Sequence, residues 1–141
     1  MRARTRVSLF LSMSLLVATL SGCTGSPGAP TAALRDEFVL APGATSTLSD
    51  GSARITFTGV TGDSRCPADA MCIQGGDAVV HIEVAGSSGR RTHELHTGSM
   101  APVTHDGLTI TLVQLMPYPF SSRPFPPDEY RATLLVTRPG R

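Results

Sequence analysis

The sequence of 141 residues contains no lysine and no asparagine, and charged residues make up only 16% of it. Without asparagine there is no acceptor for N-linked glycosylation. All twelve basic residues are therefore arginines. The low charge does not indicate disorder, because apolar residues account for 40% of the chain and can form a core. The 14 glycines and 11 prolines indicate a fold with many turns.

The sequence also lacks an apolar run long enough for an ordinary membrane-spanning helix. Residues 7–20 form an uncharged, mostly apolar stretch that follows Arg2, Arg4 and Arg6 and precedes small residues. Its length and its flanking residues are typical of a signal peptide. The arginines are not adjacent, so the sequence does not indicate a twin-arginine export signal.

The end of this segment, "LSGC" at residues 20–23, resembles the lipobox of bacterial lipoproteins. The resemblance implies that residues 1–22 are a signal peptide that is removed and that Cys23 carries a diacylglycerol. Acyl chains anchor a protein durably, at about 0.8 kcal/mol per buried methylene. An ordinary secretory signal that happens to contain a cysteine is the alternative. We therefore expect a lipid-anchored protein on the bacterial cell membrane or outer membrane, facing outside the cytoplasm.

Removal of the signal changes the charge of the chain. Residues 23–141 keep nine arginines and eleven acidic residues, a net charge of −2 with neutral histidines. No basic surplus remains, so we expect no nucleic-acid partner. Residues 23–33 are small, polar and rich in proline and glycine, and are predicted to form a flexible tether. Residues 34–141 are then a single domain.

That domain has no helical periodicity over ten or more residues. Instead, apolar and polar residues alternate in several segments separated by turn residues, which is typical of β-strands. We predict an all-β fold, a single antiparallel β-sandwich (immunoglobulin-like or similar to a small barrel) with about seven strands. The residues predicted to share a face within each segment are Ile55, Phe57 and Gly59; Ala78, Val80, Ile82 and Val84; Leu108, Ile110, Leu112 and Gln114; Ala132, Leu134 and Val136.

The segment "DSRCPADAMC", residues 63–72, contains two of the three cysteines. Outside the cytosol, where the export signal places them, disulfides form and persist. Five intervening residues can turn to bring Cys66 and Cys72 within bridging range, so we predict a disulfide. The alternatives are weaker, because a redox pair of the thioredoxin type needs C-x-x-C and a zinc site needs two further ligands.

The longer segment "DSRCPADAMCIQGGDAVVHIEV" resembles the signature of a family of small, largely uncharacterised bacterial secreted proteins and lipoproteins. The family pattern is D-S-R-C-P, a few residues, a second cysteine, an aliphatic-Trp-Ala-Gly run and a strand. This sequence has Gln74 at the tryptophan position and Gly75 at the alanine position. The resemblance implies a β-rich fold and no particular activity. A function that depends on the tryptophan is absent from this chain.

Two segments are candidate contact surfaces. Asp63, Ser64 and Arg65 are predicted to order the disulfide loop through turn hydrogen bonds and ion pairs, with presentation to a partner as the alternative. Residues 117–130, "PYPFSSRPFPPDEY", contain five prolines and are predicted to form a stiff connection rather than a central strand. Its aromatic residues either cap the sandwich or form a preorganised partner surface; they are Tyr118, Phe120, Phe125 and Tyr130.

Other chemistry has little support in the sequence. His93 and His96 would lie on opposite faces of a strand, so we expect no metal site, and no cofactor. Ser64 has no recognisable histidine and aspartate partners. We therefore expect a non-enzymatic binding or envelope-maintenance module with an envelope protein as partner. The alternatives are an inhibitor of an envelope hydrolase or protease, and a copper- or zinc-handling lipoprotein that uses histidines and methionines.

Overall fold

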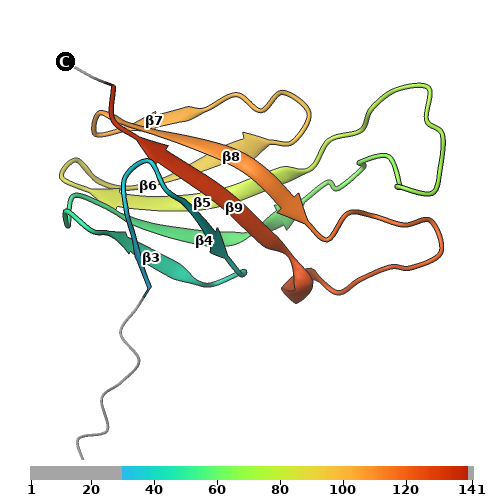
Figure 1. Ribbon diagram of the computed structural model, residues 1–141, viewed down its shortest axis with the longest axis horizontal. Coiled ribbons are helices and arrows are strands. Elements are labelled where there is room, and N and C mark those ends of the chain that lie inside the picture. The colour runs from blue at the N-terminus through green and yellow to red at the C-terminus, as the bar shows by residue number, and fades with distance from the viewer. Residues whose placement is uncertain (1–29, 140–141) are drawn as a thin grey trace, which may run out of the picture.

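The computed structural model describes residues 30–139, and residues 1–29 and 140–141 lie outside the described part. The described chain folds into two β-sheets that pack face to face (Figure 1). One sheet has the strand order β1-β3-β4-β5-β6, and the other has the order β2-β9-β8-β7. The strands are β1 (Thr31–Ala32), β2 (Glu37–Leu40), β3 (Thr45–Leu48), β4 (Arg54–Thr61), β5 (Val79–Gly86), β6 (Gly89–His96), β7 (Val103–His105), β8 (Leu108–Met116) and β9 (Arg131–Thr137), with a short 3-10 helix η1 (Pro127–Glu129) before β9.

The predicted all-β sandwich is confirmed, but the described chain has nine strands rather than about seven. One of the additional strands, β1, lies at residues 31–32, which were expected to belong to the tether. Its pairing with β3 is parallel, whereas the other strand pairs are antiparallel. Ser46 helps to hold this start of the chain, because its hydroxyl donates a 2.9 Å hydrogen bond to the Pro30 carbonyl.

The core lies between the sheets, where alternate residues of the strands face inward. In β5 and β9 the predicted alternation is confirmed: Val80, Ile82 and Val84 are buried, and so are Ala132, Leu134 and Val136. Side chains from both sheets form one buried cluster that includes Phe57, Leu95 and Leu112. At about 25 cal/mol per Å² of apolar surface, this burial is the main stabilisation of the fold.

Two β-bulges interrupt the alternation that the sequence predicts. The register between β4 and β5 shifts between Phe57 and Gly59, and the register between β8 and β9 shifts between Leu112 and Gln114. Beyond the second shift the inward-facing residue is Leu115, whereas Gln114 is exposed, so the prediction that Gln114 shares the face of Leu112 is wrong. The extra residue of a bulge turns the following side chains to the other face.

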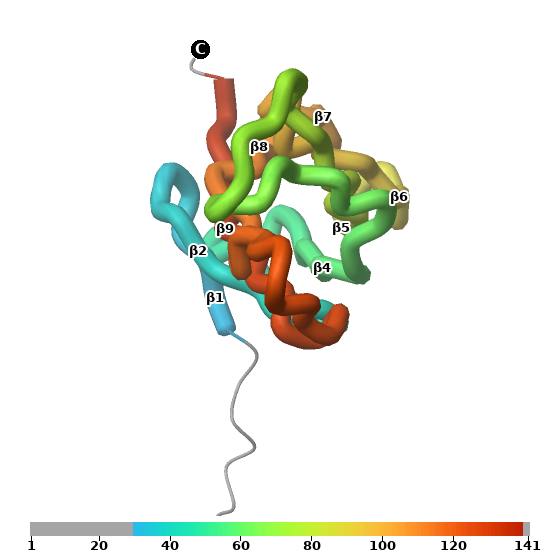
Figure 2. The backbone as a smooth tube through the Cα atoms, turned by 90° about the vertical axis from the view of Figure 1, so that its right-hand side faces the viewer, coloured from blue at the N-terminus to red at the C-terminus, as the bar shows by residue number. Residues whose placement is uncertain are grey.

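Both bulges lie near one end of the sandwich, where two long loops project. One loop connects β4 to β5 and contains the cysteines, and the other connects β8 to β9 and contains the prolines and aromatic residues (Figure 1). Seen along the long axis, the two loops lie side by side in front of the sheets (Figure 2). No helix among the described residues is long and apolar enough to cross a membrane.

Candidate functional site

The disulfide loop, residues 62–78, is closed by the predicted bond between Cys66 and Cys72, whose Cα atoms are 6.0 Å apart. The prediction of this disulfide is confirmed. The two sulfur atoms are bonded to each other, so neither is a free thiol for redox exchange or a zinc ligand. A ring of this size removes conformational freedom from the unfolded chain and fixes the loop in the folded one.

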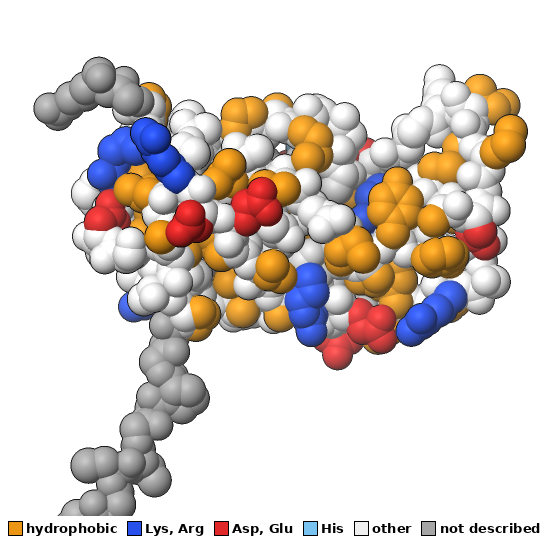
Figure 3. Space-filling model, viewed as in Figure 1, with side chains coloured by type: hydrophobic (Ala, Val, Ile, Leu, Met, Phe, Trp, Pro, Cys, Tyr) orange, Lys and Arg blue, Asp and Glu red, His pale blue; other side chains and the backbone are white. Residues whose placement is uncertain are grey.

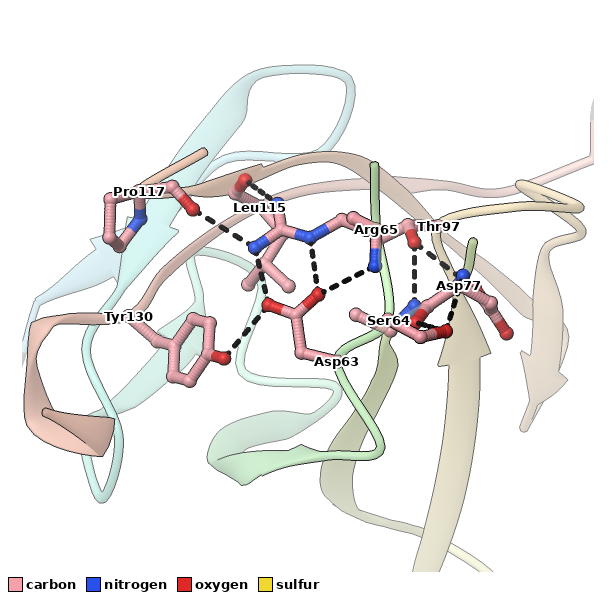
Figure 4. Close-up of polar contacts among 9 residues, drawn as sticks. Asp63, Ser64, Arg65, Asp77, Thr97, Leu115, Pro117 and Tyr130 are labelled. Carbon is pink, nitrogen blue, oxygen red and sulfur yellow. Dashed lines mark hydrogen bonds and ion pairs between the residues drawn. The ribbon is translucent and has the colours of Figure 1, made fainter. Parts of the chain in front are cut away.

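The base of the disulfide loop is held by the side chain of Arg65, which is only 7% exposed (Figure 4). Its Nε donates to Oδ1 of Asp63 at 2.9 Å, and its Nη2 donates to Oδ2 at 2.7 Å. The same guanidinium donates to the carbonyl oxygens of Leu115 at 2.7 Å and Pro117 at 2.9 Å. Arg65 therefore connects the disulfide loop of one sheet to the end of β8 in the other, with the bidentate geometry that makes such pairs strong.

Asp63 completes this network from below the guanidinium (Figure 4). Its Oδ1 accepts a hydrogen bond from the Arg65 backbone N–H at 3.2 Å, and its Oδ2 accepts one from the Tyr130 hydroxyl at 2.9 Å. Burial raises the pKa of Asp63, but the hydrogen bonds from Arg65 and Tyr130 outweigh burial and leave it below its ordinary value. Burial and the Asp63 carboxylate raise the pKa of Tyr130 to about 12. Asp63 is thus ionised, and Tyr130 stays a neutral donor.

Ser64 and Asp77 tie the two ends of the disulfide loop together. The Ser64 backbone N–H donates to the Asp77 carbonyl at 2.7 Å, and the Asp77 N–H donates to the Ser64 hydroxyl at 3.1 Å. Gly76 permits this approach, because a Cβ there would overlap the Ser64 carbonyl. His96 forms a 2.6 Å hydrogen bond with the Asp77 carboxylate, which is the main reason that the pKa of Asp77 falls to about 2.

Asp63, Ser64 and Arg65 therefore act as the loop-ordering residues that the sequence predicts. The ion pair among them joins Arg65 to Asp63. The guanidinium is buried and uses four of its five N–H groups in hydrogen bonds within the domain, so little of it is left to contact a partner.

The aromatic loop, residues 117–130, is bonded directly to the ring. The Ala68 N–H donates to the Pro119 carbonyl at 2.9 Å. Ser121 donates to Asp69 twice, from its backbone N–H at 2.8 Å and from its hydroxyl at 2.6 Å, and these bonds lower the pKa of Asp69. The Tyr118 ring lies 5.4 Å from the Arg65 guanidinium carbon, within the range of a cation–π contact. The two predicted contact segments thus form one surface.

The four aromatic residues of this loop have different positions. Tyr118 and Phe120 are about half exposed. Phe125 is partly buried and packs edge-to-face against Tyr130, with the ring centroids 5.1 Å apart. Tyr130 is buried and donates to Asp63, so its assignment to the partner surface is wrong. The sequence missed this because the carboxylate that receives the Tyr130 hydroxyl lies 67 residues away.

Exposed apolar side chains gather at this end of the molecule (Figure 3). Met71 and Ile73, on either side of Cys72, are 100% and 105% exposed. Among residues 30–139, seven large hydrophobic side chains are exposed, and only Val39, on β2, lies elsewhere. We call the other six the tip surface: Met71, Ile73, Met100, Met116, Tyr118 and Phe120.

Two hollows flank Tyr118 on the tip surface. One, of about 250 Å³, is lined by residues that include Arg65, Met100 and Gln114. The other, of about 160 Å³, lies between Met116, Phe120 and Phe125. Both are small compared with the 300–1,000 Å³ of typical ligand pockets, but they are suited to receive single side chains of a partner.

In the described part of the chain, no group of three or more His, Cys, Asp or Glu side chains converges as metal ligands would. Cys23, the predicted lipidation site, lies outside the described residues. No protein-family model, no curated protein and no solved structure matches this chain. The resemblance of residues 63–84 to a lipoprotein family therefore stays a prediction.

Proposed function

We propose that the protein is a lipid-anchored, non-enzymatic binding module of the bacterial cell envelope, and that the tip surface contacts an envelope protein. The observation that carries this proposal is the concentration of exposed apolar side chains, six of seven, at one end of the described domain. Scattered exposed hydrophobic residues are ordinary, but a contiguous apolar patch with a polar rim is typical of an interaction site.

The rigidity of the tip surface supports this proposal. Binding costs free energy for each loop and side chain that becomes ordered, and a preorganised surface avoids much of that cost. The ring is closed by a disulfide, its base is fixed by Arg65, and Asp69 joins it to the aromatic loop. Five prolines further restrict residues 117–130. The backbone of the disulfide ring and of the aromatic loop is thus preorganised for a partner.

The position of the proposed anchor favours a protein partner over the anchoring bilayer. Cys23 lies seven residues before Pro30, a reach of at most about 25 Å when extended. The described chain begins at residue 30, and its coloured trace starts toward the left of Figure 1, whereas the two loops of the tip project at the right. An anchor at Cys23 therefore holds the opposite end of the domain near the membrane and leaves the tip free.

Site-specific photo-crosslinking in living cells tests this proposal. A photoreactive amino acid at Ile73 is expected to give one discrete protein adduct, and the same group at Val39 is expected to give none. Val39 is the matched control because it is 58% exposed and lies outside the tip surface. Identical adducts from both positions, or adducts with lipid alone at Ile73, would contradict a protein-binding tip.

A second function, inhibition of an envelope hydrolase or protease, is favoured by the way the disulfide ring of residues 66–72 projects from the domain. Met71 and Ile73 flank a disulfide and are fully exposed, an arrangement suited to insertion into the cleft of a hydrolase or protease. If the module is such an inhibitor, adding the soluble domain to an envelope extract reduces peptidoglycan or protein hydrolysis. Met71→Ser/Ile73→Ser is expected to abolish the effect, while Val39→Ser keeps it. Hydrolysis that none of the three proteins changes would dismiss this function.

A further inference from the structure

His93 on β6 and His105 on β7 face each other across the edges of the two sheets. The Nε2 atom of His93 lies 3.3 Å from Nδ1 of His105, and the rings are nearly perpendicular, with an interplanar angle of 84°. His105 is buried, at 7% exposure, whereas His93 is half-buried and reaches solvent. No residue of the tip surface belongs to this pair.

The far side of His105 faces a carboxylate. Its Nε2 lies 3.5 Å from Oδ2 of Asp106, and this nitrogen has no hydrogen-bond partner within the described chain. Asp106 is held in place by the Ser88 backbone N–H at 3.0 Å, and Gly86 leaves room for it because a Cβ there would overlap Oδ2. A proton on Nε2 faces the Asp106 charge favourably, and this tautomer directs the lone pair of Nδ1 toward His93.

We infer that His93 and His105 form a binding site for a divalent transition-metal ion of the Zn²⁺, Ni²⁺ or Cu²⁺ class. Two imidazole nitrogens bonded at 2.0–2.1 Å to a tetrahedral ion are separated by about 3.3 Å, which is the separation in this pair. The ion replaces the proton that the two rings share. Imidazole ligands suit these metals and not Mg²⁺ or Ca²⁺, which prefer oxygen.

The surroundings of the pair match those of known histidine metal sites. A ligating histidine usually has a carboxylate beside its other nitrogen, and the Asp106 carboxylate lies 3.5 Å from Nε2 of His105, without a hydrogen bond between them but on the side where its charge favours a proton on Nε2. A neutral imidazole is the form that binds a metal ion, so binding at this pair weakens as the pH falls. The remaining coordination positions open to solvent beside His93 and take water.

The site would also be a clamp between the two sheets. β6 is an edge strand of one sheet and β7 is an edge strand of the other. A metal held by one histidine from each therefore joins the sheets and stabilises the folded state by mass action. The inference is independent of the proposed function, because it uses no residue of the tip surface.

The test is metal titration of the untagged chain from residue 24 onward, followed by calorimetry and by melting temperature. One equivalent of Cu²⁺, Ni²⁺ or Zn²⁺ is expected to bind and to raise the melting temperature. With Cu²⁺, electron paramagnetic resonance is expected to report two bound nitrogens. His93→Gln is the main variant because His93 is half-exposed, so the fold should survive its replacement, and it should remove this binding.

His81→Gln is the matched control, since His81 is also a half-buried strand histidine but lies outside the pair. It should bind metal as the wild type does. Asp106→Asn is expected to weaken binding about 10- to 100-fold, as loss of a carboxylate behind a ligating histidine does. Wild-type affinity in His93→Gln, or equal loss in His81→Gln, would overturn the site.

Discussion

Two buried, ionisable side chains connect the sheets of this protein, and they differ in how completely they are paired. Arg65 donates four hydrogen bonds and lies against an ionised carboxylate. His105 has one long contact with His93 and a nitrogen without a hydrogen bond. A permanently charged group that makes this many hydrogen bonds holds the segments it joins in one arrangement. A titratable group with an unused nitrogen can instead respond to a proton or a metal ion.

The largest expected effect comes from removing the guanidinium of Arg65. Arg65→Met leaves the Asp63 carboxylate, whose side chain is only 13% exposed, without its cationic partner, and we expect a loss of about 3–5 kcal/mol in the free energy of unfolding. Urea denaturation followed by circular dichroism measures it. Arg90→Met is the control, because Arg90 is exposed and pairs with Glu83 at the surface, at a cost of at most about 1 kcal/mol.

The double variant Asp63→Leu/Arg65→Met sharpens this test. It removes the unpaired charge as well, so it should lose less stability than Arg65→Met alone, although the Tyr130 hydroxyl and two carbonyls lose their partners. If Arg65→Met costs no more than Arg90→Met, the ion pair does not hold the disulfide loop.

The next largest effect measures how much the disulfide stabilises the fold beyond the hydrogen bonds of Arg65 and Asp69. Cys66→Ala/Cys72→Ala opens a ring of seven residues and is expected to cost about 2–2.5 kcal/mol in the chain-entropy treatment. Because Arg65 and Asp69 still hold the base and side of the loop, the fold should survive. Thermal unfolding with and without reductant measures the cost; reductant should lower the melting temperature of the wild type only. If reductant leaves the melting temperature of the wild type unchanged, the disulfide does not stabilise the fold.

Features that depend on neighbouring residues could be predicted from the sequence, and features that depend on pairing between distant segments could not. The strands β5 and β9 follow strict alternation, and the disulfide follows from spacing and export, so all were predicted correctly. The bulges near Gly59 and Gln114 were not, because the alternating pattern continues through both positions and only strand pairing reveals the shift. Local sequence determines periodicity, whereas register is a property of two strands.

The candidate site follows the same division. Asp63 and Arg65 are two residues apart, so their pairing could be proposed from the sequence. The roles of Tyr130 and the pair of His93 with His105 depend on contacts between segments 67 and 12 residues apart, which only the fold brings together. The exposure of Met71 and Ile73 was also unpredicted, since apolar residues in a loop give no local sign of whether they turn inward.

The smallest expected effect is the pH dependence of stability that comes from His93, the partner of His105. Burial lowers the pKa of His93 below its ordinary value of 6.5, with His105 and Arg91 contributing. The unfolded chain therefore binds this proton more tightly than the fold does, and acid favours unfolding. The free energy of unfolding therefore has its full value above pH 6.5 as far as His93 is concerned. It decreases as the pH falls from 6.5 toward the lower pKa of His93 in the folded state.

Scanning calorimetry between about pH 7 and about pH 5 measures this contribution. The carboxyl groups of Asp77 and Asp106 do not interfere, because their pKa values are about 2 in the folded chain and 3.8 in the unfolded chain, so both stay ionised over this interval. The melting temperature of the wild type is expected to fall over this interval, and that of His93→Gln to fall less, with His81→Gln as the control. Zn²⁺ should raise the wild-type value most at the upper pH, since a proton and a metal ion compete for the same nitrogen. Equal pH dependence in all three proteins would show that His93 is not coupled to folding.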